Sequence, residues 1–88
     1  MAFKIQTTPK FEKNFLKILS KSLQKRVGQE IRTLTNDPFG VTRMADIKKL
    51  RGQNQYRLRV GDYRIFYEID KANKEVVLLT VAHRKDCY

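Results

Sequence analysis

The sequence predicts an α+β domain with the element order β-α-α-β-β-β-β, in which an antiparallel pair of helices packs on one face of a mostly antiparallel sheet. Two patterns predict this class: apolar residues recur at helical spacing between residues 9 and 36, and apolar and polar residues alternate from residue 46 onward. The chain has 88 residues, of which 41% are hydrophobic, enough for one modest core. We therefore expect a single domain over residues 1–88.

A strand and a helix open the chain. From Phe3 to Thr7, apolar and polar residues alternate, which is the pattern of a half-buried strand. Thr8 and Pro9 then fit the N-cap and the first position of a helix, because proline has a helical φ and loses no needed N–H there. We expect this helix to run to about Leu19, with an apolar face made of Phe11, Phe15 and Ile18.

A second helix is expected to start at Ser20 or Ser22 and to end at residues 36–38, which read Asn-Asp-Pro. Its apolar stripe consists of Leu23, Val27, Ile31 and Leu34. Gly28 lies inside this helix and costs up to about 1 kcal/mol relative to alanine. We interpret this glycine as a position where another helix packs closely.

Four strands follow an irregular connection over residues 39–45. The first is short, from Asp46 to Leu50, and ends at turn-forming residues 51–54. The ranges Tyr56–Val60 and Tyr63–Ile69 both alternate, and the Gly-Asp pair between them fits a two-residue hairpin turn in which glycine supplies the positive φ. After a loop at residues 70–74, Glu75–His83 forms the last strand.

The hairpin predicts a cluster of arginines on one face of the sheet. With a two-residue turn, Arg59 opposes Arg64 and Arg57 opposes Phe66 across the two strands. Like charges directly opposite each other are destabilising, so a sheet built for stability alone avoids them. Three arginines beside an aromatic ring are suited to binding phosphate next to a stacking surface. The alternative is a solvated face on which Glu68 offsets one arginine.

The charge balance points to a polyanionic partner. Lysine and arginine number 19 against 9 aspartate and glutamate, a net charge of +10, which favours nucleic acid, an acidic protein or an anionic membrane surface. The single cysteine, Cys87, forms no internal disulfide, and one cysteine with one histidine cannot build a structural zinc site. The N-terminus has no signal-peptide pattern, and the longest apolar run, residues 76–79, is too short to span a membrane. We expect a soluble, cytoplasmic protein that needs no metal or other cofactor.

Further candidate residues flank the hairpin in sequence. Lys48, Lys49 and Arg51 lie just upstream and are either RNA-binding residues or ordinary surface charge. Histidine is the only side chain whose unperturbed pKa lies near neutrality, and His83, next to Arg84, is the only histidine. Its role is structural or catalytic. The sequence contains no Ser-His-Asp spacing, no glycine-rich phosphate loop and no HExxH motif.

Four segments resemble a known family: residues 49–52 (KLRG), 56–64 (YRLRVGDYR), 67–70 (YEID) and the closing 83–88 (HRKDCY). They are similar to the RelE/ParE superfamily of bacterial and archaeal toxins from type II toxin–antitoxin systems. The similarity extends over nearly the whole chain, including the strand-helix-helix start, and implies a RelE-like fold.

The resemblance also implies a function, that of a RelE-type mRNA interferase. Such a toxin inhibits translation by cleaving mRNA in the ribosomal A site without a metal, through attack of a ribose 2′-OH on the adjacent phosphate. The matching residues are Arg57, Arg59 and Arg64 on the hairpin, Arg84 after the last strand, and Tyr88 as the C-terminal tyrosine that stacks on a base.

Two features depart from the best-studied member of the superfamily. That toxin has lysines where this chain has Arg57 and Arg59, and one of them is its proposed general base. Arginine is a strong phosphate ligand but stays protonated up to a pKa above about 12, so it is a poor base. His83 is the conventional alternative for this role. The tail is also shorter, with Tyr88 only four positions after Arg84.

The partners that the resemblance implies are a cognate acidic antitoxin, the ribosome and mRNA, with operator DNA contacted only through the antitoxin and no membrane contact. Two other functions stay open. One is that of the ParE branch, whose members share the fold and poison DNA gyrase. The other is a catalytically inactive domain that acts only by binding an antitoxin or by joining a complex on operator DNA.

Overall fold

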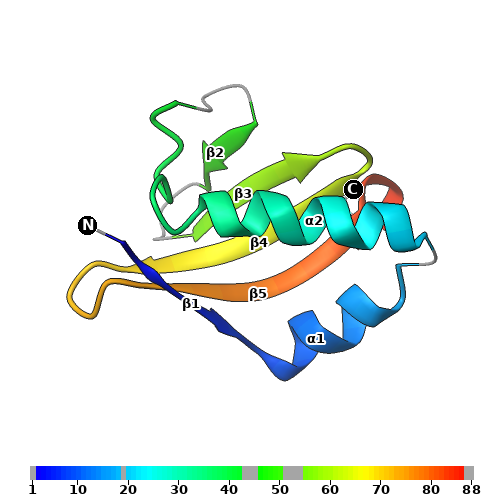
Figure 1. Cartoon of the computed structure of the whole chain (residues 1–88), viewed down its shortest axis with the longest axis horizontal. Helices are drawn as coiled ribbons and strands as arrows, with labels where there is room; N and C mark the ends of the chain where they lie inside the picture. Colours follow the sequence, from blue (N-terminus) through cyan, green and yellow to red (C-terminus); the bar gives the residue numbers. More distant parts are fainter. Residues whose placement is uncertain (1, 19, 43–45, 51–54, 87–88) are drawn as a thin grey trace.

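A five-stranded sheet forms the centre of the protein, in the strand order β1-β5-β4-β3-β2 (Figure 1). The computed structural model describes residues 2–18, 20–42, 46–50 and 55–86. Neighbouring strands run antiparallel, except that β1 pairs in parallel with β5. The elements are β1 (Lys4–Thr7), α1 (Pro9–Leu16), α2 (Lys21–Thr33), β2 (Ile47–Lys49), β3 (Gln55–Val60), β4 (Tyr63–Asp70), β5 (Glu75–His83) and the 3-10 turn η1 (Arg84–Asp86). The predicted α+β class and element order are confirmed.

The two helices bury their apolar sides in one core. α2 lies across one face of the sheet, and α1 lies beside β5, where β1 has left the sheet edge (Figure 1). Val27 and Ile31 of α2, Phe11 of α1 and the inward residues of β3, β4 and β5 belong to a single buried cluster. The opposite face of the sheet, which we call the outer face, carries the polar side chains of the hairpin.

Thr8 joins β1, α1 and β5. Its hydroxyl oxygen accepts a hydrogen bond from the Phe11 amide at 3.2 Å, as expected of an N-cap. The same hydroxyl donates to the carbonyls of Leu78 (2.9 Å) and Leu79 (3.0 Å) on β5. This contact gives the carbonyls at the edge of β5 a hydrogen-bond donor at the point where the pairing with β1 ends, and it fixes the start of α1 against the sheet.

Some boundaries differ from the sequence prediction. α1 ends at Leu16 rather than near residue 19, and the Lys17 amide closes its last turn on the Asn14 and Phe15 carbonyls. α2 starts after the predicted cap Ser20 but ends at Thr33, before the Asn-Asp-Pro segment. Of the predicted strand 46–50, only Ile47–Lys49 is a strand, although the carbonyl of residue 46 and the amide of residue 50 still bond to β3.

The interpretation of Gly28 as a close-packing position is wrong. A Cβ placed there meets nothing within 4 Å among the described residues. Gly40 is the glycine that packing requires: its φ is +73°, and a Cβ would lie 2.6 Å from Cβ of Ile47. It lets the connection after α2 pass over the buried first residue of β2.

The β4–β5 turn is held by Asp70. Its carboxylate accepts hydrogen bonds from the Asn73 side-chain amide (2.8 Å) and from the Asn73 backbone N–H (3.1 Å). These donors lower the pKa of Asp70 below its ordinary value. None of the described helices is long and apolar enough to cross a membrane.

Candidate functional site

The β3–β4 hairpin has the predicted register. Arg59 pairs with Arg64, Arg57 pairs with Phe66, and the turn residue Gly61 has a φ of +57°. Because side chains alternate along a strand, the three arginines lie on the outer face and the apolar residues of the hairpin face the core. Arg57 and Arg64 are half-buried, whereas Arg59 is exposed.

Four arginines converge on a pocket of about 400 Å³ at the turn end of this hairpin. Three of them, Arg59, Arg64 and Arg84, are sequence-predicted site residues, and the fourth is Arg26 from α2. The pocket is also lined by three acidic side chains, Glu30, Asp46 and Asp62, and by the backbone of the turn. We call this site the arginine pocket. Guanidinium groups gathered in this way are suited to bind a phosphate group bidentately.

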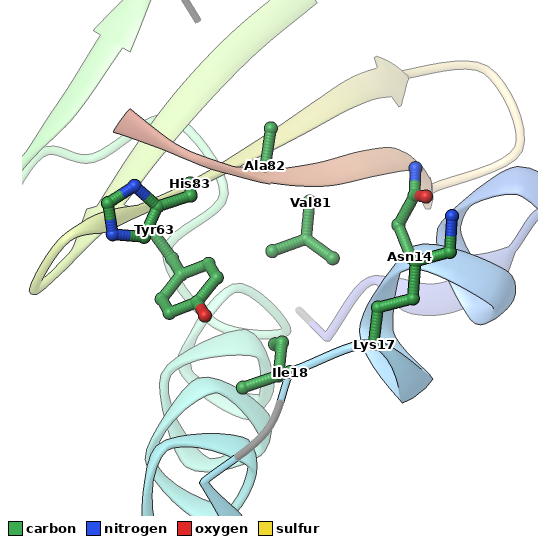
Figure 2. Close-up of a pocket in the computed structure, with 7 residues that line it drawn as sticks. All are labelled: Asn14, Lys17, Ile18, Tyr63, Val81, Ala82 and His83. Atoms are coloured by element: carbon green, nitrogen blue, oxygen red, sulfur yellow. The ribbon is translucent and has the colours of Figure 1, made fainter. Parts of the chain in front are cut away.

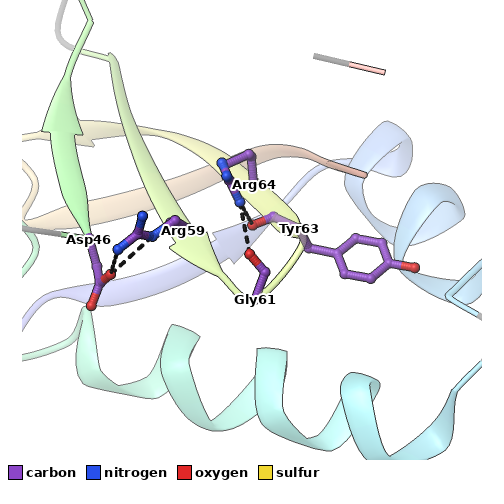
Figure 3. Close-up of polar contacts among 5 residues, drawn as sticks. All are labelled: Asp46, Arg59, Gly61, Tyr63 and Arg64. Atoms are coloured by element: carbon purple, nitrogen blue, oxygen red, sulfur yellow. Dashed lines mark hydrogen bonds and ion pairs between the residues drawn. The ribbon is translucent and has the colours of Figure 1, made fainter. Parts of the chain in front are cut away.

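Each predicted arginine of the pocket lies close to an acceptor, and Figure 3 shows the contacts of Arg59 and Arg64. Arg59 donates to Oδ1 of Asp46 from Nη2 at 3.0 Å and from Nε at 3.3 Å. Nη1 of Arg64 donates to the carbonyls of Gly61 and Tyr63, both at 3.0 Å. Nε of Arg84 lies 3.7 Å from Oδ1 of Asp62.

These contacts position the guanidinium groups more than they stabilise the fold. In the Arg59–Asp46 pair the side chains are 53% and 37% exposed, and such solvated pairs contribute about 0–1 kcal/mol. An incoming phosphate can therefore replace the carboxylate at little cost. The expected partner for an arginine, Glu68, instead accepts a hydrogen bond from Gln55 at 3.2 Å.

The other predicted RNA-binding residues divide between the two faces. Lys48, Arg57 and Phe66 form a continuous cross-strand row on the outer face. Lys49 pairs with the buried Tyr56 and so lies on the helix-facing side, away from this row. Arg51 lies outside the described residues.

His83 lies apart from the arginine pocket. It pairs with Tyr63, and the two rings make an edge contact with centroids 5.3 Å apart. Figure 2 shows both rings at one end of a second pocket, of about 350 Å³, between α1 and the end of β5. Nδ1 of His83 accepts a hydrogen bond from the Lys85 amide at 3.2 Å, so the neutral imidazole in this arrangement carries its proton on Nε2. Tyr88, the other predicted tail residue, lies outside the described residues.

Sequence reasoning missed Arg26 and the acidic residues of the pocket. Arg26 reaches the hairpin only because α2 crosses the sheet, and its Nη1 lies 3.7 Å from the position of a Cβ on Gly61. Asp46 immediately precedes β2, whose pairing with β3 brings it beside Arg59. Asp62 had a local signal, its place in the hairpin turn. Within the described residues, no three His, Cys, Asp or Glu side chains gather as a metal site.

Comparison with known proteins gives consistent matches. The family model described as "ParE toxin of type II toxin-antitoxin system, parDE" matches residues 5–88. Toxin RelE3 of Methanocaldococcus jannaschii is 35% identical over 82 residues, which cover 89% of this chain and 91% of that protein.

Two solved complexes contain a chain with a similar structure. One is the RelB–RelE antitoxin–toxin complex from Methanococcus jannaschii, with 32% identity, a TM-score of 0.73 and 94% coverage of each chain. The other is the archaeal RelE–RelB complex from Pyrococcus horikoshii OT3, with 25% identity, a TM-score of 0.81 and coverage of 96% of this chain and 97% of that one.

Proposed function

The chain belongs to the ParE toxin family of type II toxin–antitoxin systems, and we propose that it acts there as a RelE-type mRNA interferase, a metal-independent endoribonuclease that cuts mRNA in the ribosomal A site. The observation that carries this proposal is the arginine pocket, in which four guanidinium groups gather around the hairpin turn. The similarity to Toxin RelE3 favours the RelE branch.

The reaction needs phosphate stabilisation and two proton transfers. The ribose 2′-oxygen forms a bond to the adjacent phosphorus while the bond from phosphorus to the 5′-oxygen breaks. One proton leaves the 2′-OH and one reaches the 5′-oxygen, so the products are a cyclic 2′,3′-phosphate and a free 5′-OH. Negative charge grows on the phosphate oxygens in the transition state, where preorganised cationic donors are most effective.

We assign the phosphate to Arg59, Arg64 and Arg84, with Arg57 on the adjoining row. In the free protein, the acceptors of Arg59, Arg64 and Arg84 are carbonyls and carboxylates, which a phosphate can replace as a stronger anionic partner.

Proton transfer is assigned to His83 and base positioning to Tyr88. For His83 to accept a proton at Nδ1, its contact with the Lys85 amide must open. We further propose Lys48, Lys49, Arg51 and Phe66 as RNA-binding residues, with Lys49 reaching the RNA from the edge strand β2.

The proposed partner of the toxin is an acidic antitoxin. The similar solved chains come from complexes with RelB antitoxins, and a protein of net charge +10 is best neutralised by an acidic protein. Contact with operator DNA would then run through the antitoxin, and the ribosome and mRNA are the targets of the free toxin.

Inhibition of DNA gyrase is the second candidate, because the matching family model is that of ParE toxins. Induction in cells, with pulse labelling of protein and DNA synthesis, separates the two. We expect protein synthesis to stop first and Arg64→Ala to abolish this arrest. Continued protein synthesis with broken chromosomal DNA would show instead that the chain acts as a gyrase poison, like the ParE branch. Normal synthesis of both, with antitoxin binding intact, would make it a catalytically inactive partner.

A further inference from the structure

An open depression of about 530 Å³ lies on the outer face of the sheet, separate from the arginine pocket. Its apolar lining comes from Phe66 of β4 and Leu79 of β5, both half-buried. Its polar lining comes from Thr8, Lys10, Gln55 and Thr80. An apolar hollow on the charged face of so basic a protein is the kind of surface that marks a binding site.

A β-bulge shapes this depression. Phe66 pairs with Thr80 and Tyr67 pairs with Leu78, so Leu79 is an extra residue in β5. The bulge lets Leu78 stay buried in the core while Leu79 lines the depression beside Phe66. Bulges are common next to functional sites because they redirect a side chain in this way. The hydroxyl of Thr80 is fixed in turn by the Asn14 side chain, which donates to it at 2.8 Å.

Cationic groups flank the aromatic ring of Phe66 on two sides. Arg57 on β3 is its direct cross-strand partner, and Lys48 on β2 continues the same row. Arg64 precedes Phe66 by two residues on the same face of β4, a spacing of about 6.6 Å. Within the described part of the chain, the Arg57 guanidinium has no hydrogen bond or ion pair, so no partner competes there with an incoming anion.

We propose that this depression is a nucleobase subsite: an unpaired base of the RNA substrate stacks on Phe66 beside Leu79, while Arg57 and Arg64 hold the phosphates next to it. The inference rests on the proposed function in that RNA is the substrate. An aromatic ring between cations matches the alternation of base and phosphate in a single strand, which is how sequence-tolerant single-strand sites are built. A single hollow of this size suits one planar group better than the long apolar stripe of a helix.

Equilibrium binding to short RNAs tests the subsite. The RNAs are 2′-O-methylated, so that they lack the attacking hydroxyl, and each carries one abasic position in turn. We expect one abasic position to weaken binding to the native protein by roughly 5- to 150-fold, the range for one stacked base. Phe66→Ala should weaken binding of the intact RNA to the same degree and remove the sensitivity to that position. Phe66→Tyr should restore both.

Val77→Ala is the matched control: Val77, on the neighbouring strand β5, is half-buried like Phe66 but lies outside the depression, opposite Glu68. It should leave RNA binding unchanged. Equal sensitivity of the native protein and Phe66→Ala to every abasic position would overturn the subsite. So would a loss of antitoxin affinity in Phe66→Ala with unchanged RNA affinity, which would assign the depression to the protein partner. Because this assay needs no cleavage, base recognition without mRNA cleavage would contradict the proposed function alone.

Discussion

At the scale of single residues, the most informative feature is the pair of arginines that face each other at the hairpin end. Arg59 and Arg64 are direct cross-strand neighbours, an arrangement that costs some tenths of a kcal/mol to about 1 kcal/mol. The fold limits this cost by bonding Arg59 to Asp46 and Arg64 to two carbonyls. Two guanidinium groups kept close and oriented, at a cost to stability, support our proposal that this site binds phosphate.

Replacing Arg64 with alanine should lower the rate of mRNA cleavage by about 10²-fold or more, the loss typical of one transition-state donor. Arg64→Lys should recover only part of this, because an ammonium cannot reproduce the planar fork. Single-turnover cleavage rates check the prediction, with thermal melting as the control for folding. An Arg64→Ala protein that melts normally and cleaves at the native rate would remove Arg64 from the site.

The role of His83 is tested by the pH dependence of cleavage. A general base must be neutral to act, so the native rate should rise with pH as the imidazole loses its proton. His83→Ala should be slower and should lack this acidic limb. If the variant keeps the same pH–rate profile, another group accepts the proton. The role of His83 would then be structural, through the hydrogen bond that its Nδ1 accepts from the Lys85 amide.

At the scale of secondary-structure elements, the joint of β1, α1 and β5 controls how the sheet edge is closed. A single hydroxyl, that of Thr8, caps α1 and satisfies two carbonyls of β5. It also lies at the border of the depression that we assign to a nucleobase.

Thr8→Ala should lower the free energy of unfolding by about 2 kcal/mol, since it removes a helix cap and leaves strand carbonyls without a donor. Thr8→Ser keeps the hydroxyl and should retain most of the stability. Urea denaturation of the two variants checks this. Equal losses in both would show that the methyl group, rather than the hydroxyl, is what matters at this position.

The hairpin register could be predicted from the sequence because, with a two-residue turn, only one pairing register places the alternating apolar residues of both strands in the core. Because capping is local, Thr8 could be predicted as a cap, and the cap of α2 could be narrowed to Ser20 or Ser22, of which the structure has Ser20. The parallel pairing of β1 with β5 could not, since it joins residues some seventy positions apart. Arg26 was missed for the same reason: its contact with the hairpin is distant in sequence, and no local pattern predicts that α2 places it there. The bulge at Leu79 could not be predicted either, because the pattern of apolar and polar residues in the last strand does not indicate an extra residue.

At the scale of the whole molecule, charge dominates. A net charge of +10 on 88 residues creates a field that attracts polyanions from a distance and accelerates their encounter. RNA, the substrate that we propose, and an acidic antitoxin would both experience it, so we expect binding of the antitoxin to compete with binding of RNA.

The association rate of toxin and antitoxin should therefore fall steeply with ionic strength, while the dissociation rate changes little. Stopped-flow or surface-binding kinetics across a range of salt concentrations measure both rates. An association rate that is the same at low and high salt would contradict electrostatic steering and point to an apolar, locally driven encounter.

The central claim, that this chain is an mRNA interferase, is tested most directly by mapping the ends of a message translated in a purified system with and without the protein. We expect new 5′-OH ends within the codon in the A site of the ribosome, dependent on translation and lost in Arg64→Ala. An intact message in the presence of active, folded protein would contradict the claim.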